Sequence, residues 1–429
     1  MKRWSRLGIA GLGAVLGGLV GGFLVVGVTL VLKAGIDVAS SQGTWFAVTV
    51  PPLGLMLAVL ALHGYGTTAT EAGSPSWRAF PPDTARADIS ADVVDSAGRE
   101  ERFPWRLAPI RAVAILATVG LGGAMGTEAP AAYLGVAAGA WLGDRGRGWR
   151  RLLRPAALAG GAAGVAALMG IALVGSAFML ELGRRRRAPL DAERLLAALV
   201  GGAIGWGIDV FFGLSLIRLV VPKEAPGTFA QAVITAVFIG AASGVITAAA
   251  SEAVYLAKKW QAAPAVRLAI GAAATILIAL VLAWIAEPAA AVGPGGGAIL
   301  WAERIDARPA GALAVCLLRA AATTAAVAAG GCGGVFVPFL AVGDLAGRVF
   351  APGLDVGHDL AGAAGAAGGI AAGYRLPVTA AAMVLFVGGP PRATLTCLAT
   401  VVIAWAASGA VQAAQQRVAR RGRLARGRP

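Results

Sequence analysis

Residues 126–130 read Gly-Thr-Glu-Ala-Pro, and residues 334–338 read Gly-Val-Phe-Val-Pro. In each motif a glycine is followed, four residues later, by a proline at the beginning of a new apolar run. Proline is favoured in the first turn of a helix, where its missing N–H is not needed. Both motifs therefore predict a helix that begins after a break within an apolar stretch. The N–H groups at such a helix start, together with the positive end of the helix dipole, can bind an anion.

The two motifs belong to a longer internal repeat. The second lies 208 residues after the first. Five small residues recur further on at an offset of 205: Gly160, Gly164, Ala166, Ala167 and Ala177 correspond to Gly365, Gly369, Ala371, Ala372 and Ala382. Two repeats with interrupted helices in corresponding places are typical of membrane transporters, whose binding site lies between the repeats. We therefore expect two membrane repeats, residues 1–222 and 223–415, followed by a basic cytoplasmic tail at 416–429 that leaves no room for a C-terminal regulatory domain.

The composition is that of a membrane protein. Of the 429 residues, 58% are apolar and 14% are charged, and the mean hydropathy is +0.75. A soluble protein has about 25% charged residues. The 62 glycines suit close packing of helices inside a bilayer. Because the apolar runs are continuous rather than alternating, we expect an all-α integral membrane protein with tilted, broken and re-entrant helices. The continuous runs argue against a β-barrel, and the composition excludes a soluble enzyme and a disordered chain.

The net charge of +15 comes from arginine and lysine clusters that lie between the apolar runs. Clusters occur at both ends of the chain and at residues 145–154 and 184–187. This arrangement is typical of cytoplasmic loops, and it predicts a multi-pass protein of the cell membrane with both termini in the cytoplasm. The clusters do not form the basic face that a nucleic-acid-binding protein needs. The polar stretch 73–106 is interpreted as a connecting loop.

The segment between the two internal arginine clusters predicts a re-entrant hairpin. Residues 155–182 carry no charge except Glu181, and they contain five glycines. If both arginine clusters are cytoplasmic, the segment must enter the membrane and return as two short helices. The glycines would allow the turn and the close packing of these helices.

The cysteines and histidines do not indicate a cofactor. Cys316, Cys332 and Cys397 lie in apolar stretches, their spacing matches no metal site, and their odd number argues against a disulfide framework. We interpret them as small buried residues. His63 and His358 are isolated in the sequence. We therefore expect neither a metal nor a prosthetic cofactor.

Glu128 is the strongest candidate for a functional side chain. A carboxylate within an apolar stretch is costly and marks a functional site by default. One interpretation is that the carboxylate merely caps the start of its own helix. Alternatively it is a gate, whose anionic side chain occupies the place of the transported anion until protonation or an incoming anion displaces it. Because the chain has few carboxylates in its apolar stretches, an anion is favoured over a cation as the substrate.

These motifs resemble the CLC family of chloride channels and proton/chloride antiporters. The family motif G-x-F-x-P matches residues 334–338, G-(K/R)-E-G-P resembles residues 126–130, and a later R-A-P segment resembles residues 375–377. The order and spacing agree from about residue 8 to residue 410. The resemblance implies a homodimer with one anion pathway in each subunit, chloride as the substrate, protons as a possible second substrate and membrane lipid around the protein.

The resemblance also implies which residues contact the anion and the proton. Glu128 would be the gating and proton-carrying residue. The anion would be bound by the backbone around the two helix starts and by a first anion motif, G-S-G-I-P. That motif has no clean copy here, because Gly64–Thr68 places Tyr65 where serine is expected and Gly73–Pro75 keeps Ser74 but is shorter. The candidate anion-binding residues are Gly126, Thr127, Gly334, Val335, Phe336, Val337, Tyr65 and Ser74.

Two departures from the family leave the mechanism open. The inner glutamate that hands protons to the cytoplasm in family antiporters is replaced by Leu182, with Glu181 beside it as a possible substitute. The pore tyrosine near the chain end is missing around residues 408–411. The sequence therefore leaves channel and antiporter open. The alternatives are a transporter for fluoride or another anion, and a membrane protein that kept the fold and does not conduct.

The hairpin interpretation makes a prediction about topology. In a cysteine-free background, a cysteine introduced at position 186 should be inaccessible to an impermeant thiol reagent added outside intact cells, because residues 184–187 are expected in the cytoplasm. Cysteines at the two termini should behave in the same way. Labelling of position 186 from outside would contradict the hairpin.

Overall fold

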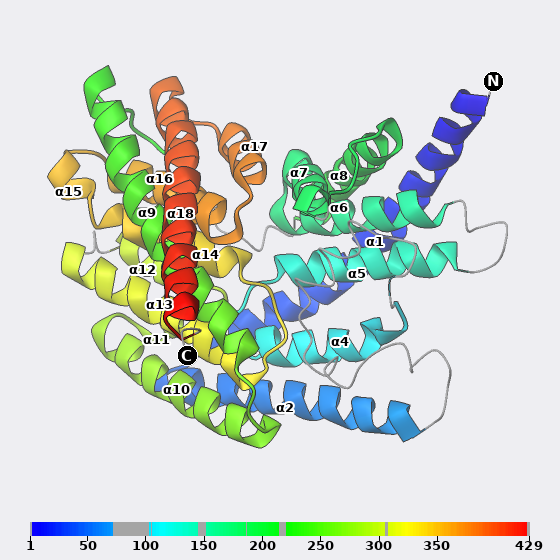
Figure 1. Ribbon diagram of the computed structural model, residues 1–429, viewed down its shortest axis with the longest axis horizontal. Coiled ribbons are helices and arrows are strands. Elements are labelled where there is room, and N and C mark those ends of the chain that lie inside the picture. The colour runs from blue at the N-terminus through cyan, green and yellow to red at the C-terminus, as the bar shows by residue number, and fades with distance from the viewer. Residues whose placement is uncertain are drawn as a thin grey trace. The chain divides into compact units, whose positions relative to one another are not determined.

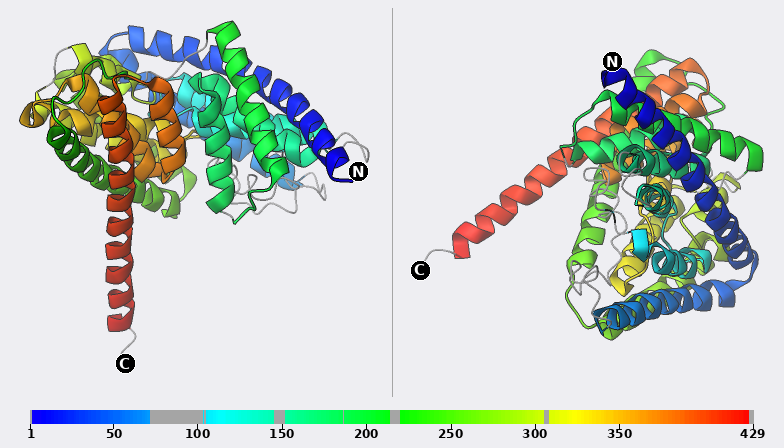
Figure 2. Two further views of the ribbon diagram at one scale, coloured as in Figure 1. Left: turned by 90° about the horizontal axis from the view of Figure 1, so that it is seen from above. Right: turned by 90° about the vertical axis from the view of Figure 1, so that its right-hand side faces the viewer.

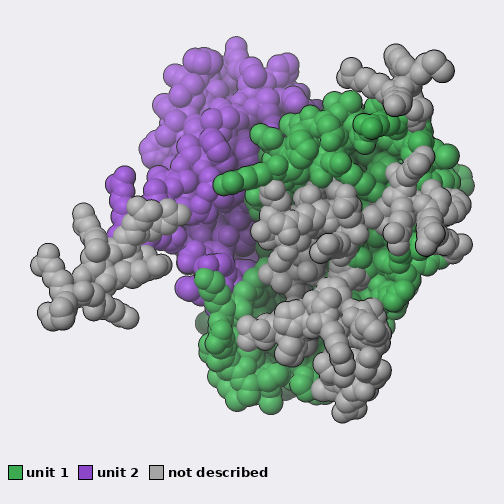
Figure 3. All heavy atoms as spheres, turned by 45° about the vertical axis from the view of Figure 1, so that its right-hand side comes forward, with its two compact units in different colours: residues 1–218, 257–298, 321–338 green, residues 219–256, 299–320, 339–429 purple. Residues whose placement is uncertain are grey.

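The structure is a computed structural model that describes residues 2–71, 103, 105–144, 152–185, 187–213, 220–304 and 308–426. Every regular element in these ranges is helical, apart from one isolated pair of bridged residues (Figure 1). The chain divides into two compact units (Figure 3). Unit 1 comprises Met1–Arg218, Ala257–Ala298 and Ala321–Pro338, and unit 2 comprises Leu219–Leu256, Ile299–Ala320 and Phe339–Pro429.

Unit 1 contains the elements from α1 to α8, together with α10 and α11. Their bounds are α1 Lys2–Ser41, α2 Thr44–Glu71, the short turn η3 Trp105–Leu107, α4 Ala108–Ile115, the π-helical turn η4 Leu116–Gly120, α5 Glu128–Gly143, α6 Leu153–Met169, α7 Ala172–Arg185, α8 Ala192–Phe212, α10 Pro264–Ile285 and α11 Pro288–Ala291.

The remaining helices lie in unit 2 or pass from one unit into the other. The helices that belong to both are α9 Phe229–Lys259, α12 Gly296–Arg304, α13 Pro309–Ala329 and α14 Phe336–Arg348. Unit 2 also contains α15 Ala351–Leu354, α16 His358–Gly369, the π-helical turn η6 Ile370–Tyr374, α17 Pro377–Val387 and α18 Pro391–Arg426. In Figure 2, α18 continues as one straight helix beyond its neighbours in unit 2.

Within the described ranges, seven helices are long and apolar enough to cross a membrane. They are Arg6–Ser41, Thr44–His63, Ala192–Phe212, Phe229–Lys259, Pro264–Ile285, Pro309–Ala329 and Pro391–Gln415. Large apolar side chains such as Phe211 and Trp284 are more than 80% exposed on two of these helices, as expected for a surface that faces lipid. The all-helical membrane fold expected from the sequence is therefore confirmed.

The helix breaks predicted within the apolar runs occur at proline and glycine residues. The run 107–143 holds α4 and α5, and the run 310–350 holds α13 and α14. Pro130 and Pro338 each stand in the first turn of the helix that follows the break, and Pro377 is the first residue of α17. Gly330 ends α13 with a φ of +96°, a conformation that glycine adopts without strain.

Residues 155–182 form the predicted pair of short helices. The helix α6 ends at Gly170, whose φ of +69° turns the chain into α7. The two helices are antiparallel, because Gly175 of α7 packs against Ala166 and Ala162 of α6, whereas Met179 packs against the earlier Gly161. The hairpin shape is confirmed, and its predicted cytoplasmic ends remain a prediction.

Small residues bring the helices of unit 1 into backbone contact. The helix α6 packs against α1, α5 and α8, which surround it in Figure 1. A Cβ atom added at Gly135 of α5 would lie 2.1 Å from the carbonyl oxygen of Gly160 on α6, and one added at Gly201 of α8 would lie 2.3 Å from that of Ala159. The glycine content of the sequence therefore serves the close packing of α6 with its neighbours.

This packing can be tested with two alanine substitutions. In Gly160→Ala the new methyl would lie 2.2 Å from the carbonyl oxygen of Gly135, so the helices must move apart, and we expect a loss of about 1–3 kcal/mol in the free energy of unfolding. In the control Gly207→Ala, on the open side of α8, the methyl meets nothing within 4 Å. Thermal unfolding in detergent should separate the two, and equal stability would contradict the packing described.

Candidate functional site

The structure brings the two sequence motifs together. Gly126 and Gly334 form an antiparallel bridge, in which the N–H of each residue donates to the carbonyl of the other at 2.7 Å. The segments that precede α5 and α14 are also tied together, because the hydroxyl of Thr118 accepts the backbone N–H of Cys332 at 3.0 Å. The starts of α5 and α14 therefore lie side by side within unit 1.

Little space is left around the two bridging glycines. A Cβ atom on Gly126 would lie 2.5 Å from Oε2 of Glu128 and 2.9 Å from Cδ of Pro338. One on Gly334 would lie 3.2 Å from the Cβ of Ala129. A side chain on Gly126 would therefore collide with Glu128 of its own motif and Pro338 of the opposite one, whereas one on Gly334 would require Ala129 to shift by a few tenths of an ångström.

Glu128 is the first residue of α5, and its side chain is fully buried. Its Oε1 accepts the hydroxyl of Thr127 at 3.1 Å, and its Oε2 accepts the backbone N–H of Val337 at 3.3 Å. The carboxylate is thus held by the N-termini of both α5 and α14.

The start of α14 has the properties expected of an anion site. The first N–H groups of a helix have no partner within the helix, and the dipole adds partial positive charge there. Gly334, Val335, Phe336 and Val337 are all buried at this start. In this structure the acceptor at Val337 is the Glu128 carboxylate.

The candidate residues of the first anion motif do not lie in the described part of the site. The backbone of Tyr65 belongs to α2, and its side chain lies outside the described residues. Ser74 lies outside the described residues altogether. The choice between the two registers of that motif therefore stays open, as do the roles of Tyr65 and Ser74.

The two residues considered for the inner proton position lie on α7. Leu182 is buried, with 1% of its surface exposed, and Glu181 is partly exposed. Another residue of α7, Phe178, contacts the site directly: its ring packs edge-on against that of Phe336, with 5.9 Å between the centroids, and both rings are fully buried. Sequence reasoning missed Phe178, although its position four residues before Leu182 places both on one face of a helix.

A second group missed from the sequence is charged. Asp344 and Arg348 of α14 are fully buried and paired, and Glu303 of α12 lies beside Arg348. The signal was present, because an aspartate and an arginine stand at i and i+4 in the run 310–350, whose other charged residue is Arg319.

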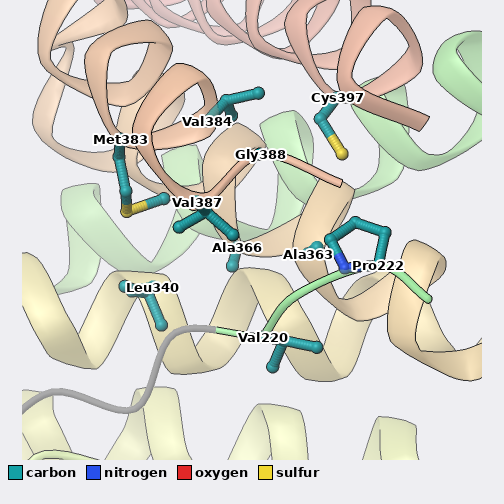
Figure 4. Close-up of a pocket in the computed structure, with 10 residues that line it drawn as sticks. All are labelled: Val220, Pro222, Leu340, Ala363, Ala366, Met383, Val384, Val387, Gly388 and Cys397. Atoms are coloured by element: carbon teal, nitrogen blue, oxygen red, sulfur yellow. The ribbon is translucent and has the colours of Figure 1, made fainter. Parts of the chain in front are cut away.

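A small pocket in unit 2 has a different character. It lies next to α14, α16, α17 and α18, and its lining is apolar (Figure 4). Cys397 is among the lining residues; like Cys316 and Cys332, it is buried and forms no disulfide. The residues that line the pocket include no charged group and no hydroxyl with which to bind an anion. The candidate site therefore remains the pair of helix starts joined by the Gly126–Gly334 bridge. The lining residues are Val220, Pro222, Leu340, Ala363, Ala366, Met383, Val384, Val387, Gly388 and Cys397.

Comparison with sequence families and curated proteins gave one match. The family described as voltage gated chloride channel matches residues 72–409, which is most of the chain. No protein with a curated description matches the sequence.

Solved structures with the same fold are known at low sequence identity. The chain is similar to a slow cyanobacterial Cl⁻/H⁺ antiporter, with 19% identity, a TM-score of 0.66 and coverage of 94% of this chain and 95% of that one. It is similar to a CLC-type fluoride/proton antiporter, with 21% identity, a TM-score of 0.66 and coverage of 94% of each. For a eukaryotic CLC transporter the identity is 15%, the TM-score is 0.63 and the coverage is 96% of this chain and 72% of that one.

The ring contact between α7 and α14 gives a stability prediction. Phe178→Ala removes a fully buried ring that packs on Phe336, and we expect a loss of about 3–5 kcal/mol in the free energy of unfolding. The control Phe386→Ala removes a ring of the same size that is 53% exposed, and it should cost far less. Chemical unfolding in detergent measures both. A Phe178→Ala protein as stable as the control would show that the contact is unimportant.

Proposed function

This chain belongs to the voltage-gated chloride channel family, the CLC family, and we propose that it carries chloride across a membrane through a pathway gated by Glu128. The family consists of channels and transporters, so the established part of its function is CLC-type anion transport by a multi-pass membrane protein, not catalysis. The identity of the anion and the role of each residue are our proposals.

The observation that carries the proposal is the hydrogen bond from the Val337 N–H to the Glu128 carboxylate. The donors at the start of α14 can serve either this carboxylate or a transported anion. Since the site is buried, a negative charge there is strongly attracted to the oriented N–H groups and is costly without them. Carboxylate and anion therefore compete for one place.

Protonation decides this competition. A proton neutralises Glu128, weakens its hold on the helix start and lets the side chain swing away, so that an anion can enter. The two repeats are chemically unequal here, because Glu128 has the uncharged Phe336 as its counterpart. One repeat supplies the competing side chain, and the other supplies donors.

Protons are the proposed second substrate. Two of the similar structures are described as proton antiporters, one for chloride and one for fluoride. In this chain the inner glutamate position holds Leu182, which cannot carry a proton. Coupling should therefore be absent or should use another carboxylate, and Glu181 is the neighbour that we consider first.

Fluoride is the second candidate anion. The similarity to the fluoride/proton antiporter is as great as that to the Cl⁻/H⁺ antiporter, at 21% and 19% identity. The serine-containing first anion motif of the family is also altered at residues 64–68 and 73–75. We further propose a homodimer in the cell membrane, which rests on the resemblance alone.

Anion efflux from liposomes tests the gate. Glu128→Gln mimics the protonated carboxylate and should remove the pH dependence of efflux between about pH 4.5 and 7.5, a range that covers the titration of a carboxylate. Glu128→Ala should open the site further, because no side chain then fills it. Efflux should be compared for chloride, nitrate and fluoride. If the glutamine variant keeps the wild-type pH profile of efflux, Glu128 is a helix cap and not a gate. If the wild-type protein transports none of the three anions, the result favours a non-conducting member of the family.

The role of Glu181 has a separate test. If wild-type protein moves protons at a fixed ratio to anions and Glu181 carries them, Glu181→Gln should abolish proton movement while anion efflux continues. Proton movement is followed with a pH electrode during anion efflux. Unchanged coupling in this variant would assign the protons to another residue.

A further inference from the structure

Arg267 is a buried charge on a helix whose surface is largely apolar and exposed. It lies near the start of α10, and 6% of its surface is exposed, compared with 47% for its neighbour Val266 and 85% for Trp284 near the end of the helix. A charged side chain that is turned inward from a membrane-spanning helix is a functional hypothesis by default.

The guanidinium of Arg267 binds the end of α13. Its Nε donates to the carbonyl of Ala328 at 3.0 Å, and its Nη2 donates to the carbonyl of Val327 at 3.4 Å. The last carbonyls of a helix have no partner within the helix, and they carry the negative end of its dipole. An arginine at this place supplies hydrogen-bond donors and positive charge together. All three residues belong to unit 1.

The turn that follows α13 has the same backbone bonds as the turn that follows η4. In each repeat two consecutive glycines donate back to the preceding helix, and the two sets of bonds are related by the repeat offset of 208. The bonds are Gly330 to Val327, Gly331 to Ala326, Gly122 to Val119 and Gly123 to Thr118. The first glycine of each pair has a positive φ, of +96° and +84°.

The first repeat forms this turn without a counterpart of Arg267. A Cβ on Gly271 of α10 would lie 2.8 Å from the carbonyl oxygen of Ala325, and one on Gly54 of α2 would lie 2.3 Å from that of Ala117. Because these two carbonyls are 208 positions apart, the two glycines occupy equivalent places. Four residues before them stand Arg267 and Val50. Valine has no side-chain donor, so the turn itself does not require the arginine.

The end of α13 leads directly into the candidate site. Gly334, which forms the bridge to the first motif, follows Ala328 by six positions. Between them, the N–H of Cys332 donates to the hydroxyl of Thr118 at 3.0 Å. The segment 328–334 is therefore held by Arg267 at its beginning, by a hydroxyl near its middle and by the bridge at its end.

This anchoring matters most in the second repeat. Phe336 stands where the first repeat has Glu128, so the start of α14 contributes backbone donors and no competing carboxylate. Donors that are fixed in place bind a charge without rearranging, and their strength depends on where they point. The donors at the start of α14 follow the segment that Arg267 holds.

We propose that Arg267 is a positioning residue of the anion site. By holding the last carbonyls of α13, it fixes the segment that leads to α14 and so directs the Val337 N–H toward the anion. Its positive charge also offsets the negative end of the α13 dipole, which would otherwise disfavour an anion nearby. The inference rests on the proposed function, in which these donors bind the transported anion.

Chloride binding to the full-length protein in detergent, measured by titration calorimetry, tests the proposal. The parent is Glu128→Ala, in which no carboxylate competes for the donors. Added to this parent, Arg267→Met keeps an apolar stem but loses the donors and the charge. We expect its dissociation constant for chloride to rise about tenfold, as when one hydrogen bond to an ion is lost. Arg267→Lys retains a charge and donors and should bind chloride more tightly than the methionine variant.

The matched control is Arg392→Met in the same parent. Arg392 of α18 also donates to a backbone carbonyl, that of Gly227 at 2.8 Å, but it belongs to unit 2. Its dissociation constant should equal that of the parent. The calorimetric titration also separates positioning from stability. A partly unfolded protein binds fewer chloride ions per chain with an unchanged dissociation constant, whereas misplaced donors raise the dissociation constant.

A second variant keeps the test decisive if Arg267→Met does not fold. The amide of Arg267→Gln can donate to one carbonyl but carries no charge, and its dissociation constant should rise at least about threefold. An unchanged dissociation constant in the folded methionine variant, or in the glutamine variant in its place, would overturn the proposal and leave the anion site intact. A lysine variant no tighter than the methionine variant would also overturn it. A parent that does not bind chloride would contradict the proposed function itself, and this inference with it.

Discussion

A helix that begins among buried residues exposes backbone N–H groups that water cannot reach, and each of them needs an acceptor. Both α5 and α14 begin in this way, at Glu128 and Phe336. Their preceding glycines satisfy each other through the Gly126–Gly334 bridge, and the Glu128 carboxylate accepts the N–H of Val337. The same unsatisfied donors that constrain the fold are the groups with which it can bind an anion. Structure and proposed function therefore depend on one physical requirement.

The surrounding structure holds these helix starts in place with small residues. The hairpin of α6 and α7 packs through glycine contacts against α5, and its Phe178 ring packs on Phe336 at the start of α14. Rigid backbone contacts of this kind leave the donors fixed, so that a side chain or an ion must move instead. This is the arrangement that a gate requires, since fixed dipoles bind a charge without rearranging.

Much of this could be predicted from the sequence. Proline and glycine act locally, so the breaks before Pro130 and Pro338 and the turn at Gly170 were predictable from their positions. Glu128 was recognisable because a carboxylate in an apolar run is rare. Its bond to Val337 was less predictable, because it joins residues that are 209 positions apart. A partner at that distance is decided by tertiary packing rather than by local pattern.

Phe178 and the approach of Glu303 to Arg348 were missed for the same reason. Phe178 is one of many apolar residues in its helix, and its contact with Phe336 has no local signature. The pairing of Asp344 with Arg348 follows helical spacing and could have been noticed, but the approach of Glu303 from α12 could not. Spacing along one helix is visible in a sequence, whereas the neighbour that a second helix supplies is not.

The central claim is that the Glu128 carboxylate and the transported anion compete for the donors at the start of α14. Crystals of the wild-type protein and of Glu128→Ala, both grown in bromide, test it directly, because the anomalous signal of bromide identifies a bound anion without ambiguity. The account predicts a bromide peak beside the Val337 N–H in the alanine variant and the carboxylate, without a peak, in wild type at a pH where Glu128 is ionised. A peak at that N–H in both proteins, or an alanine variant whose helix start binds no anion, would contradict it.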